Sequence, residues 1–323
     1  MRPGTLVAAT FGVIAGTTMV QALAQVYPDR SVRVVVPFAA GGGTDYLIRL
    51  IADRLGTGLG QTVVIENRTG AAGAIGSEAV ARSKPDGYTI LFTPGAELAT
   101  RPLLMKANPV DPIKDFTPIV APLRTFSIIA AHPATGIASG ADLIAAAKKS
   151  PAKLAYGTPG VGSAFHFAGE QLKARGVDLV HVPYRGSAPA LTAVMANETP
   201  LSINDLAITL PMMQSGKVRG LAVLEGRRHP ALPNIPTLGE SLPGYEMPES
   251  WFGFFGPAGL PSGIVQRLNT EISRAYSAPD IKAKLDERLA VVVPGSPEDV
   301  TAIINRSIQV YGAIAKTAGM QPE

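Results

Sequence analysis

The chain has 323 residues, with 29 basic and 25 acidic side chains, a net charge of +4 and no cysteine. This length suits two domains of roughly 150 residues better than one simple core. The lack of cysteine removes any thiol nucleophile, thiolate metal site or redox role, and scattered basic residues with only 6% aromatics argue against nucleic-acid binding.

The N-terminus has the three-part layout of a secretory signal. Met1 and Arg2 form a basic start, and residues 6–20 contain no charge. Small residues at Ala22 and Ala24 predict a signal peptide over residues 1–24, cut between Ala24 and Gln25. The alternative is a transmembrane anchor, but a spanning helix needs about 20 apolar residues and this run is shorter. We therefore expect export to the periplasm.

Strand-like and helix-like segments alternate along the rest of the chain. Valine-rich and other apolar runs predict strands at 32–36, 63–65, 88–92, 126–130, 154–156, 179–182, 201–203, 218–223 and 251–255. Apolar residues at helical spacing predict helices at 44–55, 142–149, 165–174, 188–195, 206–213, 264–276, 280–289 and 298–314. A further helix is predicted to follow the glycine-rich segment at 70–76 and to end at residue 81. This alternation indicates βαβ units and largely parallel sheets.

The alternation stalls near Pro118 to Pro122 and begins again at Phe126. We expect an α/β protein of two lobes, with chain crossings near 122–127 and 222–227. Lobe 1 would then comprise 25–125 with 226–323, and lobe 2 would comprise 126–225. Ligands of such sheets sit beyond the carboxyl ends of the strands, which indicates the loops at 38–45 and 157–166.

The first of these loops is rich in glycine and opens a predicted helix. Glycines let backbone N–H groups approach a ligand, and a helix N-terminus offers unpaired donors and a positive dipole end. The loop therefore predicts an anion-binding site that is formed by backbone N–H groups and needs no Arg or Lys. Its candidate ligand-binding residues are Phe38, Ala40, Gly41, Gly42, Gly43, Thr44 and Asp45. Thr44 or Asp45 could instead cap the helix, and Asp45 could act through a water molecule.

The second loop repeats this arrangement. Its candidate residues are Thr158, Gly160, Gly162, Ser163 and His166. Ser163 stands where an N-cap belongs, so simple capping is the alternative for it, and packing is the alternative for His166. A third glycine-rich segment, 70–76, adds Gly73 as a candidate, with close packing of a helix on the sheet as the alternative.

Catalysis finds no support in the same residues. No loop carries Gly-x-Gly-x-x-Gly, and the phosphate-loop lysine is absent. A serine hydrolase built on Ser163 and His166 is a remote alternative, because Ser163 lacks the Gly-x-Ser-x-Gly elbow. The four histidines show no paired metal spacing. We expect no enzyme activity, no catalytic residue, no cofactor and no metal.

Several motifs, in order, are similar to those of one known family. They are residues 27–30, 36–45, 64–73, 85–89, 156–160, 181–186, 215–219 and 257–261. The chain resembles, over essentially its whole mature length, the substrate-binding proteins of tripartite tricarboxylate transporters, the Bordetella uptake gene family. One departure is Ala39-Ala40, where the family usually has proline after the phenylalanine.

The resemblance implies a two-lobed periplasmic-binding-protein fold of type II that closes on a carboxylate in the interlobe cleft, partly through ordered water. It also implies that Tyr184 and Asp205 face the cleft. Hinge or core packing is the alternative for Tyr184, and capping of the next helix is the alternative for Asp205. We expect a monomer that passes its solute transiently to membrane transporter subunits.

Two questions stay open at this point. One is the ligand, which is a mono-, di- or tricarboxylate or an acidic amino acid. The other is the partner, because an extracytoplasmic sensor that presents its ligand to a receptor kinase is the alternative to a transport receptor.

Overall fold

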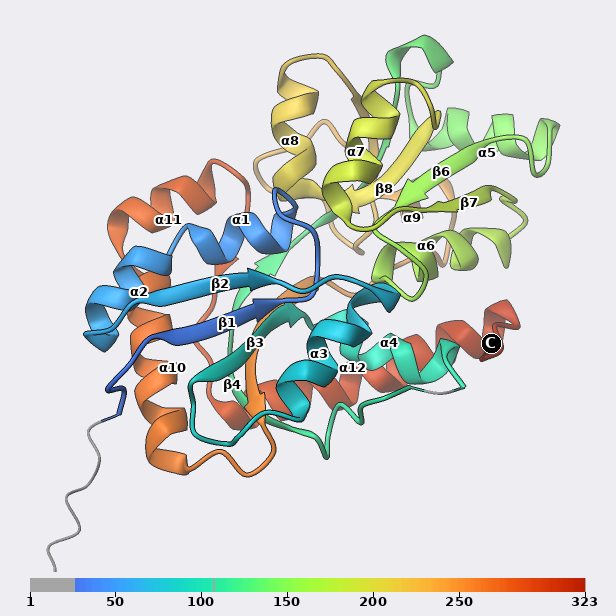
Figure 1. The fold of residues 1–323 in the computed structure, drawn as a ribbon. Coiled ribbons are helices and arrows are strands. Elements are labelled where there is room, and N and C mark those ends of the chain that lie inside the picture. The colour runs from blue at the N-terminus through green and yellow to red at the C-terminus, as the bar shows by residue number, and fades with distance from the viewer. Residues whose placement is uncertain (1–26, 107, 323) are drawn as a thin grey trace, which may run out of the picture.

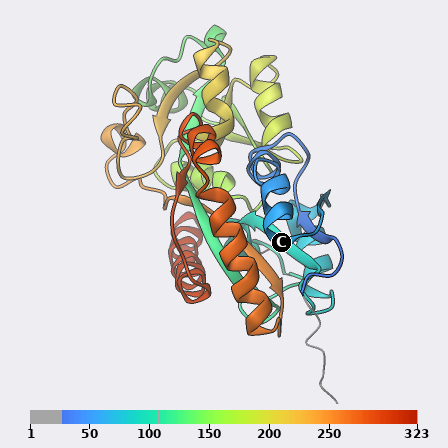
Figure 2. The ribbon, with the colours of Figure 1, turned by 90° about the vertical axis from the view of Figure 1, so that its left-hand side faces the viewer.

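The computed structural model describes residues 27–106 and 108–322, so the predicted signal peptide lies outside the described residues. Two sheets form the centres of two lobes (Figure 1). Figure 2 shows the second lobe above the first, with α10 in orange lying along the first lobe. No helix in the described part of the chain is both long and apolar enough to cross a membrane.

The first lobe contains a six-stranded sheet in the order β11-β4-β10-β3-β1-β2. Its strands are β1 (Val32–Val36), β2 (Val63–Asn67), β3 (Thr89–Pro94), β4 (Phe116–Thr125), β10 (Ser250–Pro257) and β11 (Val291–Val292). β1 pairs in parallel with β2 and β3, whereas β10 runs antiparallel to β3 and β4.

Helices cover both faces of this sheet. Apolar residues of α1 (Gly43–Arg49), α2 (Ala52–Leu59), α10 (Ser262–Tyr276) and α11 (Pro279–Asp286) form one core with the sheet. Residues of α3 (Ala74–Ala81), α4 (Gly95–Leu104) and α12 (Pro297–Ala318) form the core on the other face. A short 3-10 turn, η1 (Ala71–Gly73), precedes α3.

The second lobe contains a five-stranded sheet in the order β7-β6-β8-β5-β9. Its strands are β5 (Ser127–Ala131), β6 (Ala155–Thr158), β7 (Val180–Pro183), β8 (Leu201–Asp205) and β9 (Arg219–Val223). One face packs on α5 (Gly140–Lys149) and α6 (Ala164–Lys173), and the other packs on α7 (Ser187–Met195) and α8 (Leu206–Gln214). The short η2 (Pro133–Thr135) and α9 (Leu238–Ser241) complete the elements.

Both sheets are mixed, which differs from the largely parallel sheets that the sequence predicted. β5 runs antiparallel to β8 and β9, as β10 does in the first sheet. β5 follows the crossing between the lobes, since β4 ends at Thr125 and β5 begins at Ser127. Alternation of strands and helices gives no sign of this reversal, because strand direction depends on where the chain enters a sheet.

The sequence analysis missed two long elements, β4 and α4, and the short elements β11, α9, η1 and η2. β4 contains Pro118 and Pro122, which normally argue against a strand; its pairing with β10 shifts register near Pro118, at the point where Pro118 lies opposite Phe255. α4 contains Pro102 and the charged residues Glu97 and Arg101, so its sequence lacks an apolar face although nearly all of it is buried.

Two segments connect the lobes beyond the crossing at Phe126. Residues 226–247, which the sequence assigned to lobe 1, contribute Leu238, Leu242 and Met247 to the core of the second sheet. α12 reaches the same core from the first lobe, with its Tyr311 ring 5.4 Å from that of Phe167 in α6. The two lobes thus share one apolar cluster beside the cleft.

Candidate functional site

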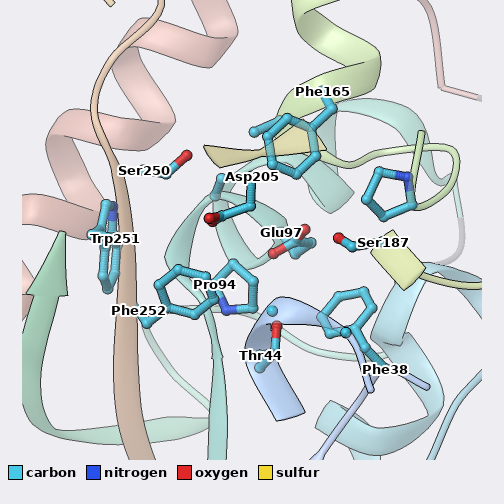
Figure 3. Close-up of a pocket in the computed structure, with 15 residues that line it drawn as sticks. Phe38, Thr44, Pro94, Glu97, Phe165, Ser187, Asp205, Ser250, Trp251 and Phe252 are labelled. Carbon is cyan, nitrogen blue, oxygen red and sulfur yellow. The ribbon is translucent and has the colours of Figure 1, made fainter. Parts of the chain in front are cut away.

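A cavity lined by buried residues lies where the two lobes meet, and we call it the inner cavity (Figure 3). It is lined by Phe38, Gly42, Gly43, Thr44, Pro94, Ala96, Glu97, Pro159, Ala164, Phe165, Ser187, Asp205, Ser250, Trp251 and Phe252. Figure 3 shows the carboxyl groups of Glu97 and Asp205 and the hydroxyl groups of Thr44 and Ser187 among aromatic rings.

The beginnings of five helices meet at the inner cavity. α1 contributes Gly43 and Thr44, α4 contributes Ala96 and Glu97, and α6 contributes Ala164 and Phe165 from their first turns. α7 contributes its first residue, Ser187, and α8 its N-cap, Asp205. The first N–H groups of a helix lack intrahelical partners and lie at the positive end of its dipole. This convergence is typical of an anion-binding site.

Trp251 reaches the inner cavity because the first residue of α4 is glycine. A Cβ atom on Gly95 would lie 1.9 Å from Cζ2 of the Trp251 ring. Any larger residue would therefore displace either the indole or the start of α4. The glycine thus lets the aromatic wall of the cavity pack directly on the helix that carries Glu97.

Both acidic groups of the inner cavity are buried, at 3% exposure each. Burial raises the pKa of Glu97 to about 8, with a smaller contribution from the charge of Asp205, although the charge of Arg101 opposes the shift. Burial also raises the pKa of Asp205 to about 6, although hydrogen bonds from Ala207 N–H and the Thr125 hydroxyl oppose the shift. A neutral Glu97 can donate a hydrogen bond to an anion at pH 7.

A second, larger cavity opens beside the first, and we call it the outer cavity. It is lined by Pro37, Phe38, Thr69, Gly70, Ala71, Gly73, Ile75, Arg101, Leu104, Met105, Pro159, Gly160, Val161, Gly162, Pro183, Tyr184 and Arg185. The volume of this cavity is about 610 Å³, whereas the volume of the inner cavity is only about 30 Å³. The inner cavity thus has room for about two water molecules, and the outer one for much more.

The lobes touch each other across these cavities. The Thr100 hydroxyl of α4 donates a hydrogen bond to the Gly162 carbonyl of the second lobe. On the other side, Arg288 donates to the Ala207 carbonyl at 3.2 Å. A Cβ on Gly43 would lie 3.3 Å from Ile208 Cγ2 of α8. These contacts describe a closed arrangement.

The structure brings nine of the fifteen candidate residues to the two cavities. Phe38, Gly42, Gly43, Thr44 and Asp205 line the inner cavity. Phe38, Gly73, Gly160, Gly162 and Tyr184 line the outer one. Ala40, Gly41, Asp45, Thr158, Ser163 and His166 line neither, although they belong to the same loops.

Asp45 holds the conformation of the first loop through side-chain hydrogen bonds. Its carboxylate accepts hydrogen bonds from Gly41 N–H, Arg49 Nε and Asn67 Nδ2, all at 2.9 Å. These bonds hold the pKa of Asp45 below its usual value against the opposing effect of burial. The N-cap of α1 is Gly42, which has no side chain, so Asp45 fixes the loop from the first turn, and neither Asp45 nor Thr44 is the cap.

Ser163 is the N-cap of α6, which was the alternative reading of this residue. Its Oγ accepts from His166 N–H at 3.2 Å and donates to the Gly160 carbonyl at 2.8 Å. The His166 ring Nδ1 accepts from Gly162 N–H at 3.3 Å. Serine and imidazole are thus both engaged with the backbone, which is not the arrangement of a serine nucleophile and its base.

The two histidines near this loop are neutral at pH 7. The rings of His166 and His181 stack with centroids 4.2 Å apart, and Nε2 of His181 lies 2.7 Å from Oγ1 of Thr158. Burial lowers the pKa of His166 to about 4 and that of His181 to about 3. Within the described ranges, no three His, Asp or Glu side chains gather to hold a metal ion.

Sequence reasoning missed several residues of the cavities, above all Glu97 and Arg101. Their spacing of four residues is typical of an exposed ion pair on a helix, and the segment was not predicted to be helical. Trp251 was noted only as part of a strand. A buried charge cannot be recognised from sequence without knowing which elements cover it.

Comparisons with known proteins cover most of the chain. A family model described as the tripartite tricarboxylate transporter family receptor matches residues 47–320. Protein BugT of Bordetella pertussis is 30% identical over 321 residues, covering 98% of each chain. The structure of R. palustris Rpa4515 with adipate has a TM-score of 0.88 and 38% identity, covering 92% of this chain and 100% of that one. Periplasmic binding protein BugD has a TM-score of 0.87 and 33% identity, with 92% and 100% coverage.

Proposed function

This chain belongs to the tripartite tricarboxylate transporter family of receptors, and on that premise we propose that the inner cavity binds the carboxylate group of its ligand. The chain is a periplasmic solute-binding receptor and not an enzyme, as the sequence predicted. Its two-lobed periplasmic-binding-protein fold is likewise confirmed.

The observation that carries the proposal is the convergence of five helix N-termini on one buried space between the lobes. Each N-terminus is worth about 0.3–1 kcal/mol to an anion when exposed and up to about 2 kcal/mol when partly buried. Charge-assisted hydrogen bonds from backbone N–H groups add to this. The adipate bound by Rpa4515 supports the carboxylate class for this chain.

Ligand binding and lobe closure are coupled in this arrangement. α1 and α4 belong to the first lobe, whereas α6, α7 and α8 belong to the second. A carboxylate therefore contacts the helix N-termini of both lobes only when the lobes are closed, and binding shifts the population toward the closed form. The loops at 38–45 and 157–166 supply part of the lining of both cavities, and Asp45 and Ser163 hold the loops in shape through hydrogen bonds to the backbone.

The remaining expectations belong to the same proposal. Residues 1–24 form a signal peptide that is cut before Gln25. Lobe 1 begins after the signal peptide, and lobe 2 begins at residue 126. Residues 226–247 pack on the second sheet, which supports a return of the chain to lobe 1 after residue 247. The mature protein acts as a monomer and delivers its solute to membrane transporter subunits.

The test is thermal unfolding of the purified protein against carboxylates and their neutral amides. The protein is first unfolded and refolded to release any bound solute, which is identified by mass spectrometry. A ligand at a hundredfold excess over its Kd adds about 2.7 kcal/mol to the free energy of unfolding, so a carboxylate should raise the Tm and its amide should not. The proposal is wrong if no carboxylate raises the Tm and none is released on unfolding.

A further inference from the structure

Two large apolar side chains stay exposed where the outer cavity opens to solvent, one from each lobe. Ile75 of α3 is 45% exposed and Val161 of the second lobe is 49% exposed, and both line this cavity. Single exposed apolar residues are ordinary on a protein surface. Apolar side chains that gather at one opening, with charged residues around them, are typical of protein interaction sites.

The backbone around Val161 presents its side chain to solvent and connects its loop to the first lobe. Gly160 and Gly162, on either side, have φ angles of 146° and 84°, a region that glycine occupies more readily than other residues. The Gly162 carbonyl accepts the hydrogen bond from the Thr100 hydroxyl of α4. The position of Val161 relative to Ile75 therefore depends on a contact between the lobes, and opening of the lobes would separate the two side chains.

The charged side chains around this opening are basic and have no acidic partner. Arg185 itself lines the outer cavity, and Arg68 and Lys106 directly adjoin lining residues in the sequence. All three are exposed, and none forms an ion pair within the described part of the chain. Among the described residues that line the cavity, none is acidic. We call these three basic residues, together with Ile75 and Val161, the mouth patch.

The composition of the mouth patch indicates the chemistry of a partner. Complementary interfaces place acidic groups opposite basic ones and exclude like charges, so the partner should carry carboxylates around an apolar centre. The family to which the chain belongs consists of receptors for a transporter, and that transporter has to distinguish the ligand-bound receptor from the empty one.

We propose that the mouth patch is the surface that docks on an acidic and apolar periplasmic segment of the membrane transporter. Ile75 and Val161 are buried in this contact, and the basic side chains pair with carboxylates of the partner around it. Because the patch takes residues from both lobes, the segment contacts all of it only in the closed receptor. The inference rests on the proposed function, since ligand binding is what favours the closed form.

The first test identifies the partner by photo-crosslinking in cells of the source bacterium. The photoreactive amino acid p-benzoylphenylalanine replaces Ile75 or Val161, one at a time. Matched controls carry it in place of Val64 or Val180, which are 47% and 42% exposed and line neither cavity. Both patch positions should crosslink to the same membrane protein, at a segment that contains Asp or Glu, and more strongly with ligand than without. Equal yield from the controls, or crosslinks only to lipid, to a second copy of this chain or to no membrane protein, would overturn the inference.

The second test reverses one charge of the mouth patch. Arg68→Glu changes a residue that lines neither cavity, and its control is Lys84→Glu, the same reversal at an exposed residue beyond the other end of α3. Titration calorimetry gives the Kd for the ligand, and uptake by cells is measured at saturating ligand. Because like charges that face each other oppose association, Arg68→Glu should lower uptake about 10-fold while its Kd stays within about twofold of wild type. Lys84→Glu should change neither quantity.

The outcomes separate docking from ligand capture. A raised Kd in Arg68→Glu, with normal uptake at saturating ligand, would mean that the charge attracts the ligand and not the transporter, which would overturn the inference and leave the proposed function standing. Normal uptake with a normal Kd would also overturn it. If the wild-type protein binds no carboxylate, the proposed function itself fails.

Discussion

Closure of the lobes can be blocked at one residue, Gly43. This glycine begins α1 in the first lobe, and a Cβ atom there would lie 3.3 Å from Ile208 Cγ2 in the second lobe. A Cβ atom at that distance is already a tight contact, and Gly43→Leu adds three more carbon atoms in addition to the Cβ. The substitution should therefore act as a wedge that leaves each lobe intact and prevents their close approach.

The magnitude follows from the cost of overpacking. Forcing extra carbons into a packed contact costs about 1–3 kcal/mol, and here only the closed form experiences it. The Kd for the ligand should rise roughly 5- to 150-fold, since about 1.4 kcal/mol corresponds to a factor of ten. The free energy of unfolding of the unliganded protein should change by no more than about 0.5 kcal/mol, as for a surface substitution.

Titration calorimetry measures the affinity, and small-angle scattering measures the compactness with and without ligand. Gly43→Leu should stay expanded when the wild-type protein contracts. Adding Ile208→Ala makes room for the leucine, so the double variant should recover affinity, with a coupling energy of about 0.5–3 kcal/mol. Wild-type affinity in Gly43→Leu, or a double variant as weak as the single one, would refute the reasoning.

Two further predictions concern stability. Glu225 is buried like Glu97, and its Oε1 accepts a hydrogen bond from Ser127 N–H. Both glutamates have pKa values of about 8 in the folded protein against an ordinary 4.5, so the stability that they contribute is complete below pH 4.5 and is lost as pH rises through 8. The Tm should fall between pH 5 and 8 and then level off, less steeply in Glu97→Gln and Glu225→Gln; a flat wild-type profile would contradict this. Gly95→Ala places a Cβ 1.9 Å from Trp251 and should cost about 1–3 kcal/mol in chemical denaturation. Gly263→Ala, where no atom lies within 4 Å, is its control, and equal stability of the two variants would count against the packing described for Trp251.

Local patterns predicted most of the elements because their signals are local. The valine-rich run at 32–36 is β1, and the predicted strand at 63–65 is the first part of β2. The glycine loops were located because a strand that ends in glycines before a helix is a local feature. The same approach failed for β4 and α4, where prolines and charges disguise segments that are stabilised by tertiary burial.

The sequence by itself determined the family, the α/β class and the two loops that open the cleft, since each of these depends on motifs or short-range periodicity. Only the tertiary structure decided which residues meet. Five helices that begin between residues 43 and 206 contribute residues of their N-terminal ends to the inner cavity, and α4 brings the buried Glu97 to the inner cavity and the buried Arg101 to the outer one. The raised pKa of Glu97 arises from burial, and burial depends on long-range packing that a local pattern does not contain.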